Sequence, residues 1–276
     1  MATQSVATQG SRSTERATIR AKTLRTDRWW IDPAITFVVF TAFVIYATWA
    51  AFNHPLVYGH GAPHRIFYAK PYLSPLYSPC VAHGCPSDVA WWHWDAWQWL
   101  SPALYILIFP LGFRATCYYY RRAYYRSYWL SPPACAVAEP HKRYSGETRF
   151  PLILQNVHRY FWYATLVFAG ILTYDVVLAF IYKGHFFLGV GTAVMLINVV
   201  LIWGYQLGCH SCRHITAGRL NHFSKHPIRY KWWTFVSKLN HWHRHWAWAS
   251  LISIACTDLY IRLVANGTIT DYHHVF

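Results

Sequence analysis

Apolar residues along this chain gather into long runs separated by polar and charged stretches. The five longest runs are Ala34–Phe52, Trp97–Phe113, Tyr160–Tyr182, Phe186–Leu207 and Trp246–Val264. Each run approaches the ~20 residues that a helix needs to cross the hydrocarbon core of a bilayer. Runs of this length with so little charge favour membrane spans over the core of a globular domain.

The predicted fold class is therefore an all-α integral membrane protein, a bundle of five transmembrane helices. The second span is short and contains Pro102 and Pro110, which membrane helices tolerate where neighbouring groups satisfy the freed backbone. Residues 1–33 are expected to form a basic tail, 34–264 the five-span domain, and 265–276 a C-terminal tail. The loop 53–96 is rich in aromatic residues, and we expect it to be ordered over the outer membrane surface.

The distribution of charge predicts the orientation in the membrane. Only 13% of the 276 residues are charged, whereas soluble domains usually carry about 25%. Of the 25 Lys and Arg residues, 21 fall in the N-terminal tail, in 114–159 and in 208–244, which the five spans place on one side. By the positive-inside rule that side is the cytoplasm, so we expect a multi-pass plasma-membrane protein with a cytoplasmic N-terminus and an external C-terminus.

The net charge of +15 could also indicate nucleic-acid binding. Because the basic residues concentrate in particular loops, we attribute the charge to topology and to contact with anionic membrane lipid, and we expect no nucleic-acid partner.

Topology also sorts the seven cysteines. Cys80 and Cys85 lie in the external loop, where an oxidising environment favours a disulfide between them, and a metal site that includes His83 is the alternative. Cys117 and Cys135 are isolated on the cytoplasmic side and are interpreted as structural.

Two clusters of cysteine and histidine lie at the cytoplasmic ends of the fourth and fifth spans. Cys209 and Cys212 form a Cys-x-x-Cys pair within GCHSCRH, and the chain returns through NHWHRHW, which contributes His241, His243 and His245. Spans joined by one loop are often neighbours, so these clusters are expected to face each other. Thiolates and imidazoles are the ligands of tetrahedral metal sites and of iron–sulfur centres.

The histidine ligands are not resolved by spacing alone. His241 ranks first because His241 and His245 share a helix face, whereas an extended lead-in would pair His241 with His243. His210 and His214 are weaker candidates, since His210 points about 100° away from Cys209 on an ideal helix.

Three kinds of centre use such residues: a zinc site, a haem b with His158, His210 or His214 as axial ligands, and a [2Fe–2S] cluster of the Rieske pattern with two Cys and two His ligands. The Rieske pattern uses all the unusual residue types present. A structural zinc would make the chain a membrane scaffold rather than an electron carrier.

Two acidic residues lie within the predicted spans, where ionisable groups are functional hypotheses by default. Asp258 can pair with Arg262 four residues later. Asp175 has no such partner in its own helix, and we expect it to line a proton path or to pair across helices.

The chain has five predicted spans, a cytoplasmic N-terminal tail, GCHSCRH at the end of the fourth span and NHWHRHW at the start of the fifth. In these features it resembles the membrane anchor of the actinobacterial (mycobacterial-type) succinate dehydrogenases, in respiratory complex II. The resemblance implies that flavoprotein and iron–sulfur subunits dock on the cytoplasmic face and that the anchor passes their electrons to a membrane quinone, expected to be menaquinone. It also implies a Rieske-type [2Fe–2S] centre in place of haem b, held by Cys209, Cys212 and two of the 241–245 histidines.

A quinone site needs hydrogen-bond donors for the carbonyl oxygens and an apolar, aromatic wall. Candidates at the cytoplasmic ends of the spans are Tyr118, Arg121, Trp129, His158, Arg159 and Tyr160. No dinucleotide-binding glycine motif follows a predicted strand, so the chain alone is expected to be an electron-transfer subunit without the dehydrogenase site.

Overall fold

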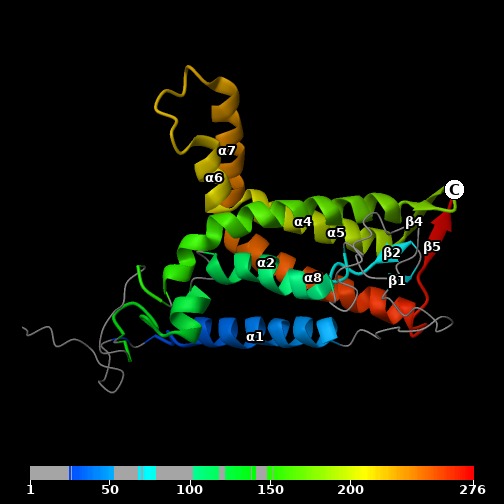
Figure 1. Ribbon diagram of the computed structural model, residues 1–276, viewed down its shortest axis with the longest axis horizontal. Helices are drawn as coiled ribbons and strands as arrows, with labels where there is room; N and C mark the ends of the chain where they lie inside the picture. The colour runs from blue at the N-terminus through cyan, green and yellow to red at the C-terminus, as the bar shows by residue number, and fades with distance from the viewer. Residues whose placement is uncertain are drawn as a thin grey trace, which may run out of the picture.

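Five long helices lie alongside one another in the computed structural model and form the body of the molecule (Figure 1). They are α1 (Ile31–Phe52), α2 (Pro102–Thr116), α4 (His158–Ala179), α5 (Val190–Leu207) and α8 (His243–Ala265). The structure describes residues 25, 27–52, 68–69, 71–78, 102–117, 122–137, 139–140, 148–150 and 152–276.

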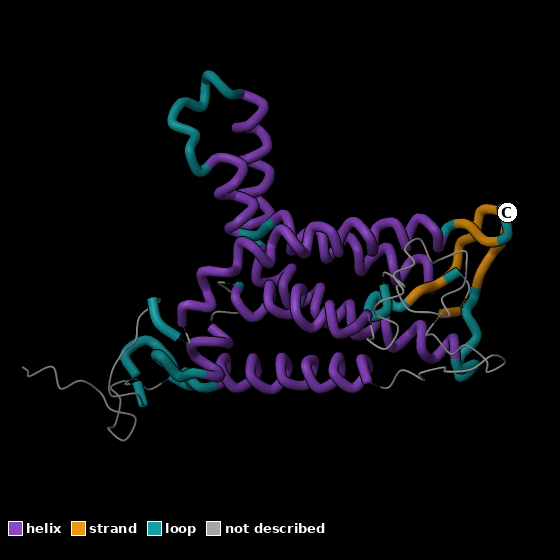
Figure 2. The backbone as a smooth tube through the Cα atoms, in the orientation of Figure 1, coloured by secondary structure: helices purple, strands orange, loops and turns teal. Residues whose placement is uncertain are grey.

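The five helices alternate in direction along the bundle, and the two ends of the bundle carry different residues. At one end α1, α4 and α8 begin and α2 and α5 finish; we call it the cysteine end, because Cys117, Cys209 and Cys212 lie there. The opposite end, with the C-terminus and the strands, is the strand end (Figure 2). Its strands are β1 (Tyr68–Ala69), β2 (Tyr72–Leu73), β3 (Ile181–Tyr182), β4 (His185–Gly189) and β5 (His273–Val275).

The strands form two small antiparallel sheets. β1 pairs with β2, and β4 lies between β3 and β5 in a three-stranded sheet. Lys183 and Gly184 join β3 to β4 with positive φ angles of 51° and 81°, the backbone of a two-residue hairpin turn.

This hairpin changes two predicted boundaries. The apolar run was expected to be helical from Phe186, but residues 185–189 are strand and α5 begins at Val190; the preceding helix stops at Ala179 rather than at Tyr182. A short apolar run cannot by itself distinguish a strand from a helix segment, and here pairing with β5 decides in favour of the strand.

Four shorter helices of the described residues lie at the cysteine end. A π-helix, η2 (Arg122–Tyr128), packs on α1, and a 3-10 helix, η3 (Leu152–Val157), leads into α4. Helices α6 (His210–Ala217) and α7 (Pro227–His241) pack on each other and project sideways from the bundle (Figures 1 and 2).

Among the described residues, four helical segments are long and apolar enough to cross a membrane: 31–50, 153–179, 190–207 and 243–265. Side chains such as Val38, Val167 and Ile197 are more than half exposed on these helices, as expected of surfaces that face lipid. At 15 residues, α2 is shorter than the other four, so a fifth crossing remains a prediction. Most of the predicted external loop 53–96 lies outside the described residues.

Close contacts between the helices hold the cysteine end together. A Cβ on Gly204 of α5 would lie 2.7 Å from the Trp246 ring of α8, and one on Gly112 of α2 would lie 2.7 Å from the Phe161 ring of α4. Glycine at these positions therefore lets the helices approach closely. The buried core formed by this packing includes Cys117, Cys209 and Cys212.

Candidate metal centre

Two cysteine–histidine pairs lie in the core of the cysteine end. The Sγ of Cys117 is 3.3 Å from Nε2 of His243, and the Sγ of Cys209 is 3.1 Å from Nε2 of His158. Cys117 follows α2, His158 begins α4, Cys209 joins α5 to α6, and His243 begins α8. The two pairs are neighbours, because Cys117 and Cys209 belong to one buried cluster and the rings stacked on the two imidazoles, Phe113 and Tyr205, contact each other. Four span ends thus bring two thiols and two imidazoles into one group.

Burial determines the chemical state of these groups. Cys117, Cys209 and His243 are each about 1% exposed. Burial, with a smaller contribution from Cys117, raises the pKa of the Cys209 thiol well above its usual range. A buried thiol of this kind stays protonated until a bound cation displaces the proton.

Thr116 determines which nitrogen of His158 faces Cys209. The Thr116 hydroxyl donates to the Gly112 carbonyl at 2.7 Å, which uses its one proton, and its oxygen lies 2.9 Å from Nδ1 of His158. With the hydroxyl proton on the Gly112 carbonyl, the Thr116 oxygen accepts from a protonated Nδ1, and this tautomer leaves Nε2 with a lone pair directed at Cys209. Metal-binding histidines are held in this way, with one nitrogen bonded to the protein and the other available to the metal.

Aromatic stacking fixes the planes of both imidazoles. Phe113 stacks on His158 with ring centroids 4.8 Å apart, and Tyr205 stacks on His243 at 4.9 Å. On Tyr205 lies the guanidinium of Arg114, 4.7 Å from the ring centroid, which also donates to Ala247 O and Ser250 Oγ of α8 at 2.9 Å each. Both rings are therefore held by neighbouring side chains.

Of the remaining predicted metal ligands, Cys212 belongs to the same buried cluster as Cys117 and Cys209, and the four histidines are exposed. Cys212 is buried one turn into α6, where its carbonyl accepts a bond from Thr216. His241 and His245 are exposed and both pack against Trp242. His214 is exposed and contacts Arg159 Nη2 through its Nδ1 at 2.7 Å, and His210 is exposed.

Sequence reasoning missed Cys117 as a candidate ligand and considered His158 only for haem or quinone. Neither residue is part of a short motif, because each is contributed by a different span. The available signal was the position of each residue relative to the membrane. Cys117, His158, Cys209 and His243 all lie at the cytoplasmic end of a predicted span.

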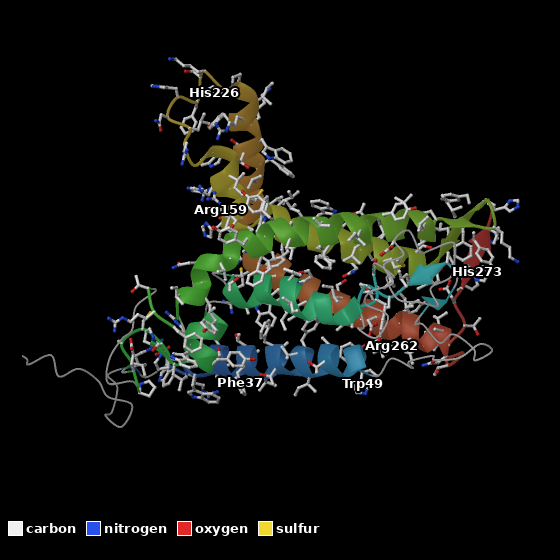
Figure 3. The ribbon with its side chains drawn as sticks, viewed as in Figure 1. Phe37, Trp49, Arg159, His226, Arg262 and His273 are labelled. Atoms are coloured by element: carbon white, nitrogen blue, oxygen red, sulfur yellow. The ribbon has the colours of Figure 1, made fainter. Side chains whose placement is uncertain are left out.

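The predicted quinone contacts are spread over the cysteine end. His158 belongs to the centre described above, and Arg159 contacts His214 at the base of the α6–α7 projection (Figure 3). Tyr160 is 73% exposed and Trp129 is 37% exposed. Tyr118 and Arg121 lie outside the described residues, as do Cys80 and Cys85 of the predicted disulfide.

Within the described residues, no group of three or more His, Cys, Asp or Glu side chains is arranged to hold a single metal ion. The four donors at the cysteine end form two pairs instead. A structural zinc needs four ligands that converge on one point, whereas a [2Fe–2S] cluster takes two protein ligands on each of two irons. Each pair here joins one thiol to one imidazole, whereas the Rieske pattern places both imidazoles on the same iron.

The two membrane acids are bonded at the strand end. Asp258 pairs with Arg262, whose Nε lies 2.6 Å from Asp258 Oδ2, as the spacing of four predicted. Asp175 accepts a hydrogen bond from Ser78, in the segment 71–78 that precedes α2. The partner of Asp175 therefore comes from another segment of the chain.

Residues 31–267, which include all four donors, match the family model of the actinobacterial succinate dehydrogenase subunit SdhC. The chain belongs to this family. A similar solved structure is that of the Mycobacterium smegmatis Sdh1 complex in the apo form, with which this SdhC-family chain shares 50% sequence identity at a TM-score of 0.80 over 98% of both chains. No curated protein sequence matches the chain. The match extends over almost the whole SdhC-family chain, so its membrane helices and the cysteine end belong to the shared fold.

Proposed function

We propose that this SdhC-family chain anchors a succinate dehydrogenase in the plasma membrane and passes electrons from a docked iron–sulfur subunit to a membrane quinone. In this proposal Cys117 and Cys209 would supply the two thiolate ligands of a Rieske-type [2Fe–2S] cluster, and His158 and His243 the two imidazole ligands. The observation that carries it is the burial of two thiols in contact with two imidazoles, 3.1 and 3.3 Å apart. When bound, such a cluster supplies one-electron redox chemistry at a potential that histidine ligation raises.

The residues of the chain have distinct tasks in this proposal. Cys117 and Cys209 give up their thiol protons to become thiolate ligands. Thr116 retains the proton on Nδ1 of His158, so that Nε2 stays available. Phe113 and Tyr205 hold the imidazole planes and exclude water from the group.

The proposed ligand set differs from the one expected from the motifs. Cys209 and His243 belong to both sets. Cys117 replaces Cys212, and His158 replaces a second histidine from 241–245, because these are the residues in contact with Cys209 and His243.

The soluble subunits are proposed to dock at the cysteine end, on the cytoplasmic side. The segments 114–159 and 208–244 and the N-terminal tail carry 21 of the 25 Lys and Arg residues. This asymmetry supports a cytoplasmic N-terminus by the positive-inside rule. Electrons from an iron–sulfur subunit docked there would arrive at the end of the bundle that contains the four donors.

Quinone is proposed to bind beside the same group, and menaquinone is the expected species. Arg159 and Tyr160 follow His158 directly, and both are exposed on the outside of α4. Their side chains can donate hydrogen bonds to quinone carbonyl oxygens within the membrane interface.

Iron, acid-labile sulfide and electron paramagnetic resonance of the purified complex test the proposal. We expect His158→Ala combined with His243→Ala to remove the cluster signal and quinone reduction, while succinate oxidation by an artificial acceptor continues. The matched control is His241→Ala combined with His245→Ala, which removes two exposed histidines of the same region.

Loss of the signal in the control but not in the first variant would support the motif-based ligand set instead. A reduced haem b absorption band in the wild-type complex would contradict the cluster. Zinc without iron would indicate a structural scaffold.

A further inference from the structure

The projection formed by α6, α7 and the residues between them, 210–241, is a feature that the electron-transfer proposal does not use. We call it the α6–α7 hairpin. It leaves the bundle at the cysteine end and extends sideways, with Arg159 near its base and His226 near its tip (Figure 3). Arg229 Nε donates to Thr216 O, and the Arg213 guanidinium lies 5.1 Å from the centroid of the Trp233 ring, so the two helices form one unit.

Helix α7 has one face that packs and one that does not. Val236 and Asn240 are buried, and Asn240 Nδ2 donates to Gly208 O at 2.7 Å, which attaches the helix to the end of α5. Apolar residues recur on another face at spacings of four, three, four and three residues, the period of a helical stripe. The stripe consists of the exposed Ile228, Trp232, Phe235 and Trp242 and the half-buried Leu239.

The stripe is exposed to a degree unusual for side chains of this size. Ile228 is 84% exposed, Trp242 55%, Trp232 48% and Phe235 44%. In water such a continuous apolar surface would be costly, so it indicates contact with lipid or with another protein.

Charge favours lipid as the partner. Residues 208–244 contain seven Lys and Arg residues and no Asp or Glu. Lys231 and Lys238 precede Trp232 and Leu239 by one residue each, which places both exposed amines along one edge of the stripe. Aromatic and aliphatic residues on one face with flanking cations are the pattern of helices that lie in the bilayer interface.

The position of the hairpin agrees with that pattern. It connects α5 to α8, two helices long and apolar enough to cross the membrane, and it branches where both reach the same end of the bundle. A segment that extends sideways at that level runs along the membrane surface rather than toward a subunit docked over the end.

We propose that α7 lies in the headgroup layer at the cysteine end, with its apolar stripe against the acyl chains and Lys231 and Lys238 bound to phosphates of anionic phospholipids. The hairpin then widens the footprint of the subunit in the membrane and holds the cysteine end at a fixed depth. This proposal stands independently of the metal centre.

Photo-crosslinking in the intact complex tests the contact. Trp232→p-benzoylphenylalanine places the probe on the stripe, and Trp233→p-benzoylphenylalanine places it one residue away, where the native ring packs against Phe223 and Arg213. In vesicles of phosphatidylglycerol and phosphatidylcholine, we expect lipid adducts at position 232 that exceed those at 233 several-fold. Protein adducts at 232, no adducts at 232, or equal lipid adducts at both positions would overturn the proposal.

A second measurement tests the choice of anionic lipid. With the probe at 232, Lys231→Gln and Lys238→Gln are each expected to lower the ratio of phosphatidylglycerol to phosphatidylcholine adducts roughly fivefold, the equivalent of about 1 kcal/mol per cation near the surface. Lys183→Gln, in the turn at the strand end, is the matched control and should leave the ratio unchanged. An unchanged ratio in the first two variants, or an equal fall in the control, would overturn recognition of anionic headgroups.

Discussion

At the scale of single residues, the Thr116 hydroxyl group orients the His158 ring at the cysteine end. Thr116 bonds both the Gly112 carbonyl and Nδ1 of His158, and so it orients the imidazole that faces Cys209. Outer hydrogen bonds of this kind typically change metal affinity by about 10–100-fold when they are removed.

We therefore expect Thr116→Val to lower the iron and sulfide content of the complex and to weaken its cluster signal, since valine keeps the shape of threonine but accepts no hydrogen bond. Thr116→Ser retains the hydroxyl and is expected to behave as the wild type. Full cluster content in the valine variant would show that stacking on Phe113 is sufficient to orient His158.

At the scale of elements, the distance between α5 and α8 determines whether Cys209 and His243 remain near each other. Gly204 of α5 lies against Trp246 of α8, three residues after His243. A methyl group at position 204 would force the Trp246 ring or the helix axis to move, and overpacking of this kind usually costs about 1–3 kcal/mol.

Gly204→Ala is accordingly predicted to lower the thermal unfolding midpoint of the purified protein. Gly170→Ala on α4 is the matched control, because a Cβ there has no atom within 4 Å among the described residues. Since alanine is the better helix former by about 1 kcal/mol, the control should keep or raise the midpoint. A fall of the same size in both variants would contradict the close-packing explanation.

At the scale of the whole molecule, a buried polar network holds the strand end together. Asp258 of α8 accepts hydrogen bonds from Tyr46 of α1 and from Ser74, and it pairs with Arg262. The Arg262 guanidinium also donates to Tyr77 and lies 5.1 Å from the centroid of the Trp49 ring (Figure 3). The network therefore joins α1, the segment 71–78 and α8.

Breaking a buried ion pair on one side leaves an uncompensated charge, at a cost of about 3–5 kcal/mol. We expect Arg262→Met to destabilise the protein strongly in thermal unfolding, and Asp258→Leu combined with Arg262→Met to recover much of the loss. If the double variant is no more stable than the single one, the bonds of Asp258 to Tyr46 and Ser74 matter more than its pairing with Arg262.

The sequence alone predicts more of the fold than of the candidate site. Long apolar runs predict membrane helices because the bilayer demands about 20 apolar residues per crossing, and that requirement is local in sequence. The family was likewise identified from GCHSCRH and NHWHRHW, and the family match over residues 31–267 confirms it. Pairing of Asp258 with Arg262 could be predicted for the same reason, since both lie on one helix.

Other features depended on residues distant in the chain. Residues 185–189 carry an apolar pattern that suits a helix or a strand, and pairing with β5, which lies some 85 residues later, makes them a strand. The contacts of Cys117 with His243 and of His158 with Cys209 join residues 126 and 51 positions apart. No local spacing encodes these contacts, because they arise where four separately formed helix ends pack together.

The sequence by itself thus determined the membrane class, the family and the chemical kinds of residue available for a centre, since these follow from composition, charge and short motifs. The tertiary structure alone decided which cysteines meet which histidines, that Asp175 accepts from Ser78, and that α7 presents an exposed apolar stripe. The physical reason is that a helix brings together residues three or four positions apart, whereas a site between helices is formed only when their side chains pack.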